Sequence, residues 1–314
     1  MKRLIVILAV LVVAGISGGV ALQHAGELFA QDNNGPKERI TLSPASEELS
    51  MEAGTEKSGK ITVINNGETD YRFNVYAAPF SVKGEDYNPD FTTVNERTRA
   101  YEWIEFTQTS LQLDAGERTT VDYTLDVPEN AAPGGHYAVL FAETQPPEGE
   151  ASVARKKRIG TLLYLSVDGD IQTSGSLGSL TTKFWQTGAP ITSDVRVKND
   201  GNVHFTANLD AHYKNLFGRQ QFQLKKETRI MPGTTRRIPV AWENAPYFGI
   251  FKTGGTVTFL DTTEDLPEQY VILLPYPLLA GLVGAIVLLV SYIVLKRRRL
   301  NGGRVNFASK AKKR

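Results

Sequence analysis

Apolar and polar residues alternate along most of the chain between its two uncharged segments. Residues 121–127 read VDYTLDV, and residues 205–213 read FTANLDAHY. A period of two is typical of strands with one buried and one solvated face, whereas the apolar stripe of a helix recurs every three to four residues. Residues 38–268 contain no comparable helical stripe. The pattern predicts an all-β fold.

Turn-forming residues divide these strands in the same order in two parts of the chain. Each part has a strand, an Asn-Gly or Asp-Gly turn, a second strand, a Gly turn into a third strand, and a Gly-x-aromatic entry to a fourth. The segments are 61–76, 111–128 and 133–143 in the first part, and 195–213, 229–242 and 248–261 in the second. Such a repeat predicts two tandem immunoglobulin-like β-sandwiches.

The two sandwiches are expected at residues 38–171 and 172–268, joined by the Gly/Ser-rich stretch TSGSLGSL. The strand GTLLYLSV before this stretch is apolar on both faces, and we expect it to pair with residues 137–143. Matching strands lie further apart in the first part than in the second, so the first sandwich carries an insertion, at residues 80–99.

Residues 271–295 are uncharged and mostly apolar, and they run directly into Lys296 and three arginines. A helix of this length exceeds a hydrocarbon core of about 30 Å, so the segment predicts a transmembrane helix. The basic residues of 296–314 favour a cytoplasmic tail, which places the preceding residues outside the cytoplasmic membrane. Residues 1–30 have the layout of a secretory signal, and their apolar run is also long enough for an uncleaved N-terminal anchor.

Charge and cysteine content narrow the partners and the source. Eleven of the 35 Lys and Arg lie in residues 2–3 and 296–314, which leaves 24 bases against 34 acids in the remainder. An acidic ectodomain argues against nucleic acid as a partner, since binding phosphates needs a basic face. The chain has no cysteine. Exported eukaryotic domains usually carry disulfides, so this absence favours a bacterial or archaeal surface protein, and we expect a single-pass bacterial membrane protein.

Motifs of known enzymes are missing from the sequence. It contains no G-x-S-x-G, Walker or H-E-x-x-H string, and without cysteine it has no thiolate nucleophile or zinc ligand. His136 falls in a turn, and alternation places His204 and His212 on the polar face of one strand, so we expect solvated histidines. The sequence therefore predicts no catalytic residue, no metal site and no cofactor.

The insertion and the residues after it offer the first candidate binding site. Tyr87, Phe91, Arg97, Tyr101 and Trp103 supply aromatic rings and cations suited to stacking on sugars or anchoring a protein partner. The alternative is that these aromatics enter the core. We expect Tyr87 and Arg97 to lie outside the core, and removal of residues 82–95 to leave stability nearly unchanged.

A basic cluster, Arg155, Lys156, Lys157 and Arg158, is the second candidate. In an acidic ectodomain it is suited to anionic wall polymers, and a solvated loop at a hairpin tip is the alternative. The acidic segment 85–90 offers oxygen ligands for Ca²⁺ but lacks a defined ligand spacing, which favours a solvated acidic loop.

Four segments resemble one family of bacterial surface proteins. They are NVHFTANLDAHY, IMPGTTRRIPVAW, DVPENAAPGGHYAVLFAE and GTLLYLSVDGDI. Together they look like the WxL-interacting proteins, and the resemblance covers about residues 40–299. It implies a signal peptide, a peptidoglycan-binding-type and a host-binding-type immunoglobulin-like domain, a C-terminal membrane helix and a basic tail.

These observations predict a non-enzymatic, membrane-anchored surface protein. Its expected role is adhesion or scaffolding through cell-wall polymer or another surface protein. An accessory extracytoplasmic subunit of a membrane or surface complex is the alternative, and a cryptic hydrolase is the least expected reading because no motif favours it.

Overall fold

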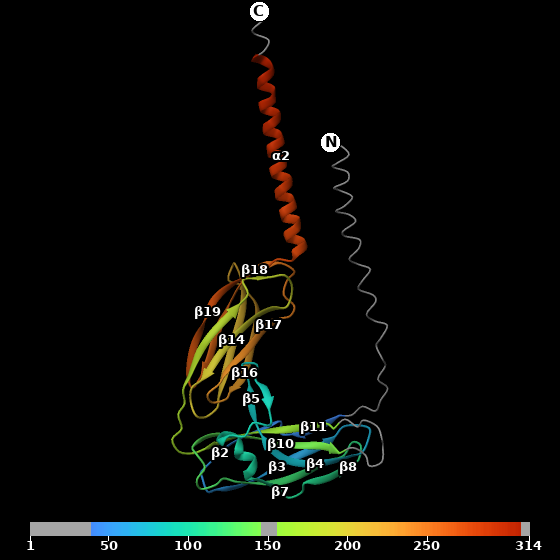
Figure 1. The fold of residues 1–314 in the computed structure, drawn as a ribbon, viewed down its shortest axis with the longest axis vertical. Helices are drawn as coiled ribbons and strands as arrows, with labels where there is room; N and C mark the ends of the chain where they lie inside the picture. The colour runs from blue at the N-terminus through green and yellow to red at the C-terminus, as the bar shows by residue number, and fades with distance from the viewer. Residues whose placement is uncertain (1–38, 146–155, 309–314) are drawn as a thin grey trace, which may run out of the picture.

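A computed structural model describes residues 39–145 and 156–308. The signal or anchor segment expected in residues 1–30 lies outside the described residues. Strands dominate, and the all-β prediction of immunoglobulin-like sandwiches is confirmed. Figure 1 shows two sandwiches, one lying across the foot of the other, and a helix rising from the far end of the second.

Sandwich 1 is built from two sheets, with strand orders β1-β3-β9-β7 and β2-β11-β10-β4-β8. All neighbours pair antiparallel except β2 and β11, which run parallel. The strands are β1 (Ile40–Ser43), β2 (Ser46–Met51), β3 (Glu56–Asn65), β4 (Tyr71–Pro79), β7 (Ile104–Phe106), β8 (Ser110–Leu113), β9 (Arg118–Asp126), β10 (Gly134–Gln145) and β11 (Arg158–Val167).

The core of sandwich 1 follows from alternation in these strands. In β9, Val121, Tyr123 and Leu125 are buried while the residues between them face outward. The predicted pairing of the strand after residue 157 is confirmed, because β11 runs antiparallel to β10 with Tyr137 opposite Tyr164. Burying one apolar face of each sheet against the other supplies the main stabilising free energy of such a fold.

Sandwich 2 repeats this plan with strand orders β12-β14-β17 and β13-β19-β18-β15-β16. The short β13 pairs parallel to β19, and the other neighbours are antiparallel. The strands are β12 (Gly175–Thr182), β13 (Trp185–Gln186), β14 (Ile191–Asn199), β15 (Phe205–Asn215), β16 (Gln220–Ile230), β17 (Thr235–Trp242), β18 (Gly249–Phe259) and β19 (Thr262–Leu273).

A bulge in β18 depends on a glycine at one position. The register of β18 against β19 shifts between Thr253 and Gly255, and Gly255 has a φ of 146°. A Cβ atom on Gly255 would lie 2.1 Å from the carbonyl oxygen of Asp210 in β15. Only glycine has both the conformational freedom and the space for this backbone approach.

The insertion of sandwich 1 folds into a small hairpin and a 3₁₀ helix. Strands β5 (Ser81–Lys83) and β6 (Asn88–Asp90) pair with each other alone, and η2 (Glu96–Trp103) follows them. In Figure 1 the hairpin rises from sandwich 1 toward sandwich 2. It reaches the second sandwich instead of lying free in solvent.

The helix α2 (Tyr276–Ala308) leaves the end of sandwich 2 that is opposite to sandwich 1 (Figure 1). Residues 276–297 are long and apolar enough to span a membrane, and none of the window is buried within the protein. The predicted start at residue 271 is wrong, because Val271 lies in β19 and is fully buried in the core of sandwich 2. The helix also continues through Lys296 and Arg297, where the cytoplasmic tail was expected to begin.

Candidate binding site between the two sandwiches

Strand β10 is the structural base of the site because it is buried on both of its faces. Ala138, Leu140 and Ala142 belong to the core of sandwich 1. The alternate residues, Tyr137 and Val139 among them, form a separate apolar cluster on the outer face of the sheet. The hairpin and Met231 of sandwich 2 cover this outer face. A sheet face of this composition stays out of water only when another element packs on it.

We call the contact between the two sandwiches, made by the hairpin and by the outer face of β10, the joint. The tip of the hairpin makes its central contact. Tyr87 has a φ of 58°, an uncommon conformation for a side chain of this size, and its hydroxyl accepts a hydrogen bond of 2.9 Å from the backbone N–H of Met231. The same hydroxyl bonds Thr234 Oγ1. The Arg236 guanidinium lies 4.2 Å from the centre of the Tyr87 ring. The prediction that Tyr87 lies outside the core is wrong, since it is 8% exposed.

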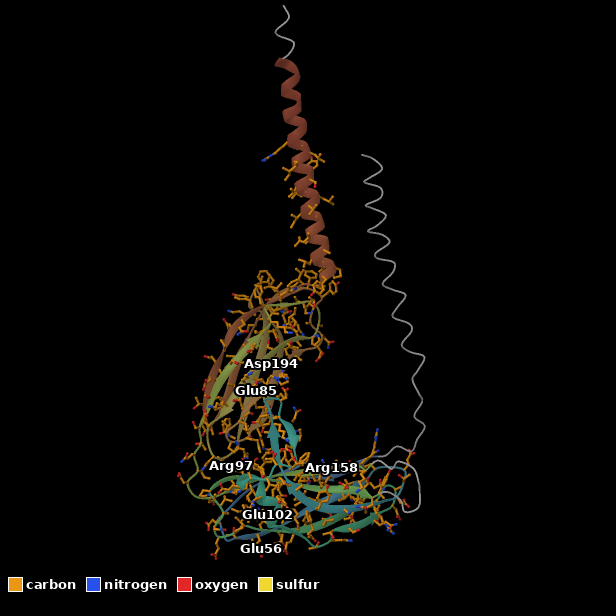
Figure 2. The ribbon with its side chains drawn as sticks, viewed as in Figure 1. Glu56, Glu85, Arg97, Glu102, Arg158 and Asp194 are labelled. Carbon is orange, nitrogen blue, oxygen red and sulfur yellow. The ribbon has the colours of Figure 1, made fainter. Side chains whose placement is uncertain are left out.

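Acidic residues at the hairpin tip pair with arginines of sandwich 2. Glu85 accepts a hydrogen bond of 2.7 Å from Arg196 Nε, and Asp86 accepts one of 2.6 Å from Arg237 Nε. The backbone N–H of Arg237 also donates to the Glu85 carbonyl at 2.8 Å. Figure 2 shows Glu85 beside sandwich 2, near Asp194. The carboxylates that the sequence offered as Ca²⁺ ligands are therefore engaged by cations of the same chain.

A histidine joins the sandwiches on the other side of this contact. His204 is 7% exposed, and its ring packs between Tyr137 and Tyr164 of sandwich 1. Its Nε2 lies 3.2 Å from a carboxylate oxygen of Glu48, and its Nδ1 lies 3.3 Å from the Tyr137 hydroxyl. One neutral tautomer satisfies both contacts, with Nε2–H donating to Glu48 and Nδ1 accepting from Tyr137.

Burial lowers the pKa of His204, and the hydrogen bond to Glu48 opposes that change without reversing it. Burial also acts to raise the pKa of Glu48, but hydrogen bonds from Arg229 and His204 outweigh it, so that pKa is lowered. The expectation of solvated histidines is wrong for His204 and for His136, which is 2% exposed in β10. His204 directly precedes β15, where sandwich 1 covers the face that alternation assigns to solvent.

Arg97 belongs to the joint as well. The Asn95 side chain accepts hydrogen bonds from the backbone N–H groups of Arg97 and Thr98 and so begins η2. This start directs the Arg97 Nη1 to the carbonyl oxygens of Asn202, at 2.7 Å, and Gly135, at 3.3 Å. In Figure 2, Arg97 and Arg158 lie on either side of the hairpin where it leaves sandwich 1.

The remaining candidates pack on sandwich 1. Phe91 stacks near Phe80, and Arg158 lies 5.4 Å above its ring. Trp103 packs against His136 with ring centres 4.9 Å apart, and it is half-buried like Tyr101. The sequence grouped these residues in one site, whereas the structure spreads them over the joint, the outer face of β10 and the far side of η2.

The basic cluster is divided among different partners. Lys156 Nζ lies 3.5 Å from Glu143, and Arg158 lies 4.8 Å above the Phe141 ring. Lys157 takes part in backbone pairing, since its carbonyl accepts from Thr144 N at 2.8 Å. Arg155 lies outside the described residues. The described residues of the cluster therefore do not form a continuous basic surface.

A cleft of about 340 Å³ opens where hairpin, η2 and sandwich 2 meet. Its charged groups have partners: Asp90 is buried and accepts from Lys83, Thr92 and Thr93. Hydrogen bonds from Thr93 and Thr92 hold the pKa of Asp90 far below its ordinary value. Both sandwiches line the cleft, through Phe80, Ser81, Val82, Lys83, Asp90, Thr93, Asn95, Arg97, Thr98, Tyr137, Met231, Pro232 and Thr234.

This lining suits binding better than catalysis. Asp90 is held ionised by its hydroxyl neighbours, and Arg97 is directed at backbone carbonyls, so neither is poised to exchange a proton with a substrate. Within residues 39–145 and 156–308, no three or more His, Asp or Glu side chains are grouped so that they could hold a metal ion. The cleft instead presents apolar side chains beside hydroxyl groups.

No family model and no curated protein sequence matches the chain. Among solved structures, the class 5 fimbriae chaperone CfaA is 12% identical with a TM-score of 0.39, over 76% of this chain and all of the chaperone. The chaperone YadV is 11% identical with a TM-score of 0.39, over 74% of this chain and 99% of that one. The E. coli chaperone DraB is 12% identical with a TM-score of 0.36, over 74% and 96%.

Similarities of this size do not bear on what the chain binds. The immunoglobulin-like sandwich that the resemblance to WxL-interacting proteins implies is present. Membership of that family stays a prediction.

None of the residues that sandwich 2 contributes to the joint is among the binding-site candidates from the sequence. These residues are Arg196, Asn202, His204, Arg229, Met231, Thr234, Arg236 and Arg237. One feature of the sequence indicated that sandwich 1 has a neighbour. Residues 134–142 are apolar or small at almost every position, which indicates a strand with both faces covered and therefore a neighbour beyond its own sandwich.

Proposed function

We propose that this chain is a non-enzymatic, membrane-anchored binding protein whose two sandwiches stand outside a bacterial cytoplasmic membrane. The apolar helix and the basic residues that follow it support this topology, with the tail in the cytoplasm. External protease on cells stripped of any outer layer should digest an epitope in sandwich 1 and spare one at Arg314. Loss of the tail epitope with survival of the sandwich would reverse the topology.

The partner class is a protein segment bound in the cleft between the sandwiches. One observation carries this choice: the cleft is lined from both sandwiches, and the hairpin joins them so that its walls keep their spacing. Sugar stacking needs exposed aromatic faces. Tyr87, Phe91 and Trp103 are packed against protein instead, so the support for a wall-polymer ligand is weaker.

Crosslinking in cells tests the cleft directly. A photoreactive side chain placed at Lys83, an exposed residue at the lip of the cleft, should give a discrete protein adduct. The matched control is Lys57, an exposed lysine of β3 in the other sheet of sandwich 1, which should give none. Val82→Asp, which places a charge on the lip, should abolish the adduct at position 83.

Two outcomes would contradict the proposal. Equal adducts at positions 83 and 57 would place the contact elsewhere. Retention of the purified protein on isolated wall polymer that survives Val82→Asp, without any protein adduct, would assign the ligand to the wall instead.

A further inference from the structure

The end of sandwich 2 from which α2 emerges displays an unusual set of exposed apolar side chains. Phe217 is 94% exposed and Leu216 60%, both in the turn between β15 and β16. Tyr247 and Phe248, in the loop between β17 and β18, are each 64% exposed. Rings of this size scattered singly are ordinary, but several gathered at one end of a domain mark a contact surface.

Strand register places these loops at one level. Asn215 lies opposite Phe251, and Gly249 lies opposite Leu273 at the end of β19. The loop before β18 therefore borders the two residues that connect β19 to α2, and the turn between β15 and β16 lies at the same end of the sheet, beyond β18. The helix α2 begins at this same end of sandwich 2 (Figure 1).

The turn that carries Leu216 and Phe217 is held in shape by Asn215. The Asn215 side-chain oxygen accepts hydrogen bonds of 3.0 Å from the backbone N–H groups of Phe217 and Arg219. Asn215 N donates to the Arg219 carbonyl at 2.9 Å, and Gly218 supplies the positive φ. A turn fixed in this way presents its two apolar side chains to the surroundings in a defined direction.

Sandwich 2 is also tied to the start of the helix. Trp185 Nε1 donates to the Leu274 carbonyl at 3.0 Å, and the Trp185 ring packs edge-on against Tyr276. Only Leu274 and Pro275 separate β19 from α2. The exposed rings are thus held beside the point where the chain would enter a bilayer, the level at which tryptophan and tyrosine are enriched in membrane proteins.

The charge of this end is basic. Lys183, Lys214, Arg219 and Lys252 lie at it against Glu243 and Glu268, and Glu268 pairs with Lys252. Basic side chains beside apolar ones are attracted to anionic phospholipid headgroups, whereas the remainder of the ectodomain is acidic and would be repelled.

We propose that this end of sandwich 2 docks on the bilayer surface, with Leu216, Phe217, Tyr247 and Phe248 inserted among the headgroups of a membrane that contains anionic lipid. The inference rests on the membrane span of the proposed function, and it does not depend on what the cleft binds. It assigns to these loops the role of holding the ectodomain upright on the membrane.

The absence of cysteine allows a direct test on the full-length chain. Phe217→Cys carries a single environment-sensitive fluorophore, in nanodiscs of phosphatidylcholine with about a quarter phosphatidylglycerol. Thr173→Cys, at an exposed position between the sandwiches, is the matched control. Lipids brominated near the headgroup should quench the label at 217 at least about twofold more than the label at 173, since interfacial side chains lie only about 5–10 Å deep.

A second label, at Tyr247→Cys, reports from a separate loop and guards against a local effect of substituting Phe217. Equal quenching by brominated lipid at 217, 247 and 173 would overturn the proposal. Protection of 217 from aqueous iodide without quenching by lipid would also overturn it, because a second copy of the chain would then cover the patch. Neither result involves a residue of the cleft, so failure here is distinguishable from failure of the proposed function.

Discussion

Removing the Tyr87 hydroxyl from the joint should measurably lower the free energy of unfolding of the ectodomain. Tyr87→Phe keeps the ring and deletes the hydroxyl that accepts from the buried N–H of Met231. A buried donor left without a partner costs about 1–3 kcal/mol. With a urea dependence of about 2 kcal/mol/M, a loss of about 2 kcal/mol lowers the unfolding midpoint by about 1 M. Far-UV circular dichroism of the full-length protein in detergent follows that midpoint.

Tyr101→Phe is the matched control for this measurement. The Tyr101 hydroxyl bonds only to exposed Glu102 among the contacts described, so its removal should change stability by less than about 0.5 kcal/mol. A double-mutant cycle of Tyr87→Phe with Thr234→Val should show a coupling of at least about 0.5 kcal/mol, since the two hydroxyls bond each other. Equal midpoints for Tyr87→Phe and Tyr101→Phe would refute the assignment of Tyr87 as the centre of the joint.

Three further substitutions or conditions test other parts of the structure. Burial lowers the folded-state pKa of His204 below 6.5, so the unfolded chain binds more protons than the folded chain near that pH. The free energy of unfolding should therefore fall as the pH is lowered through 6.5. Urea titrations at several pH values should show a smaller pH dependence for His204→Gln. Asp86→Asn should cost less than about 1 kcal/mol, because its pair with Arg237 is largely solvated; a loss above that range would show a coupling we do not expect. Gly255→Ala should cost at least about 2 kcal/mol, seen as a lower melting temperature, because its Cβ would collide with the Asp210 carbonyl; a melting temperature like that of the unsubstituted protein would contradict the bulge geometry.

The alternation of apolar and polar residues was sufficient to predict the sandwiches, because in each strand the apolar residues mark the face that packs on a core. It failed where a face is covered by something distant in sequence. His204 occupies a position that alternation assigns to solvent, and sandwich 1 buries it. The pairing of β10 with β11 was predictable because both strands are apolar on both faces in their central residues, 137–142 and 162–165. The elements that cover the outer face of β10 could not be predicted, because the apolar residues that pack on it come from segments far apart in the sequence.

The insertion shows that the sequence could not predict long-range contacts at the candidate site either. Sequence identified residues 80–99 as additional to the repeat, and an addition to a rigid fold is a reasonable place to seek function. Its tip, Gly84, Glu85 and Asp86, has the residues of a solvated turn. Nothing local indicates that these acids meet Arg196 and Arg237. Removal of residues 82–95 should therefore destabilise the ectodomain, contrary to the expectation from loop length alone.

The short connection between β19 and α2 limits how far sandwich 2 can move relative to the helix. With two residues between strand and helix, sandwich 2 has no flexible linker that would let it move away from the start of α2. Strand β19 rises about 40 Å over its 12 residues, and the joint lies at its distant end. Under the proposed topology, the cleft is therefore held about that distance above the membrane surface. A membrane-anchored partner would then have to project that far from the bilayer to reach the cleft, and a wall-bound partner would have to lie at that level.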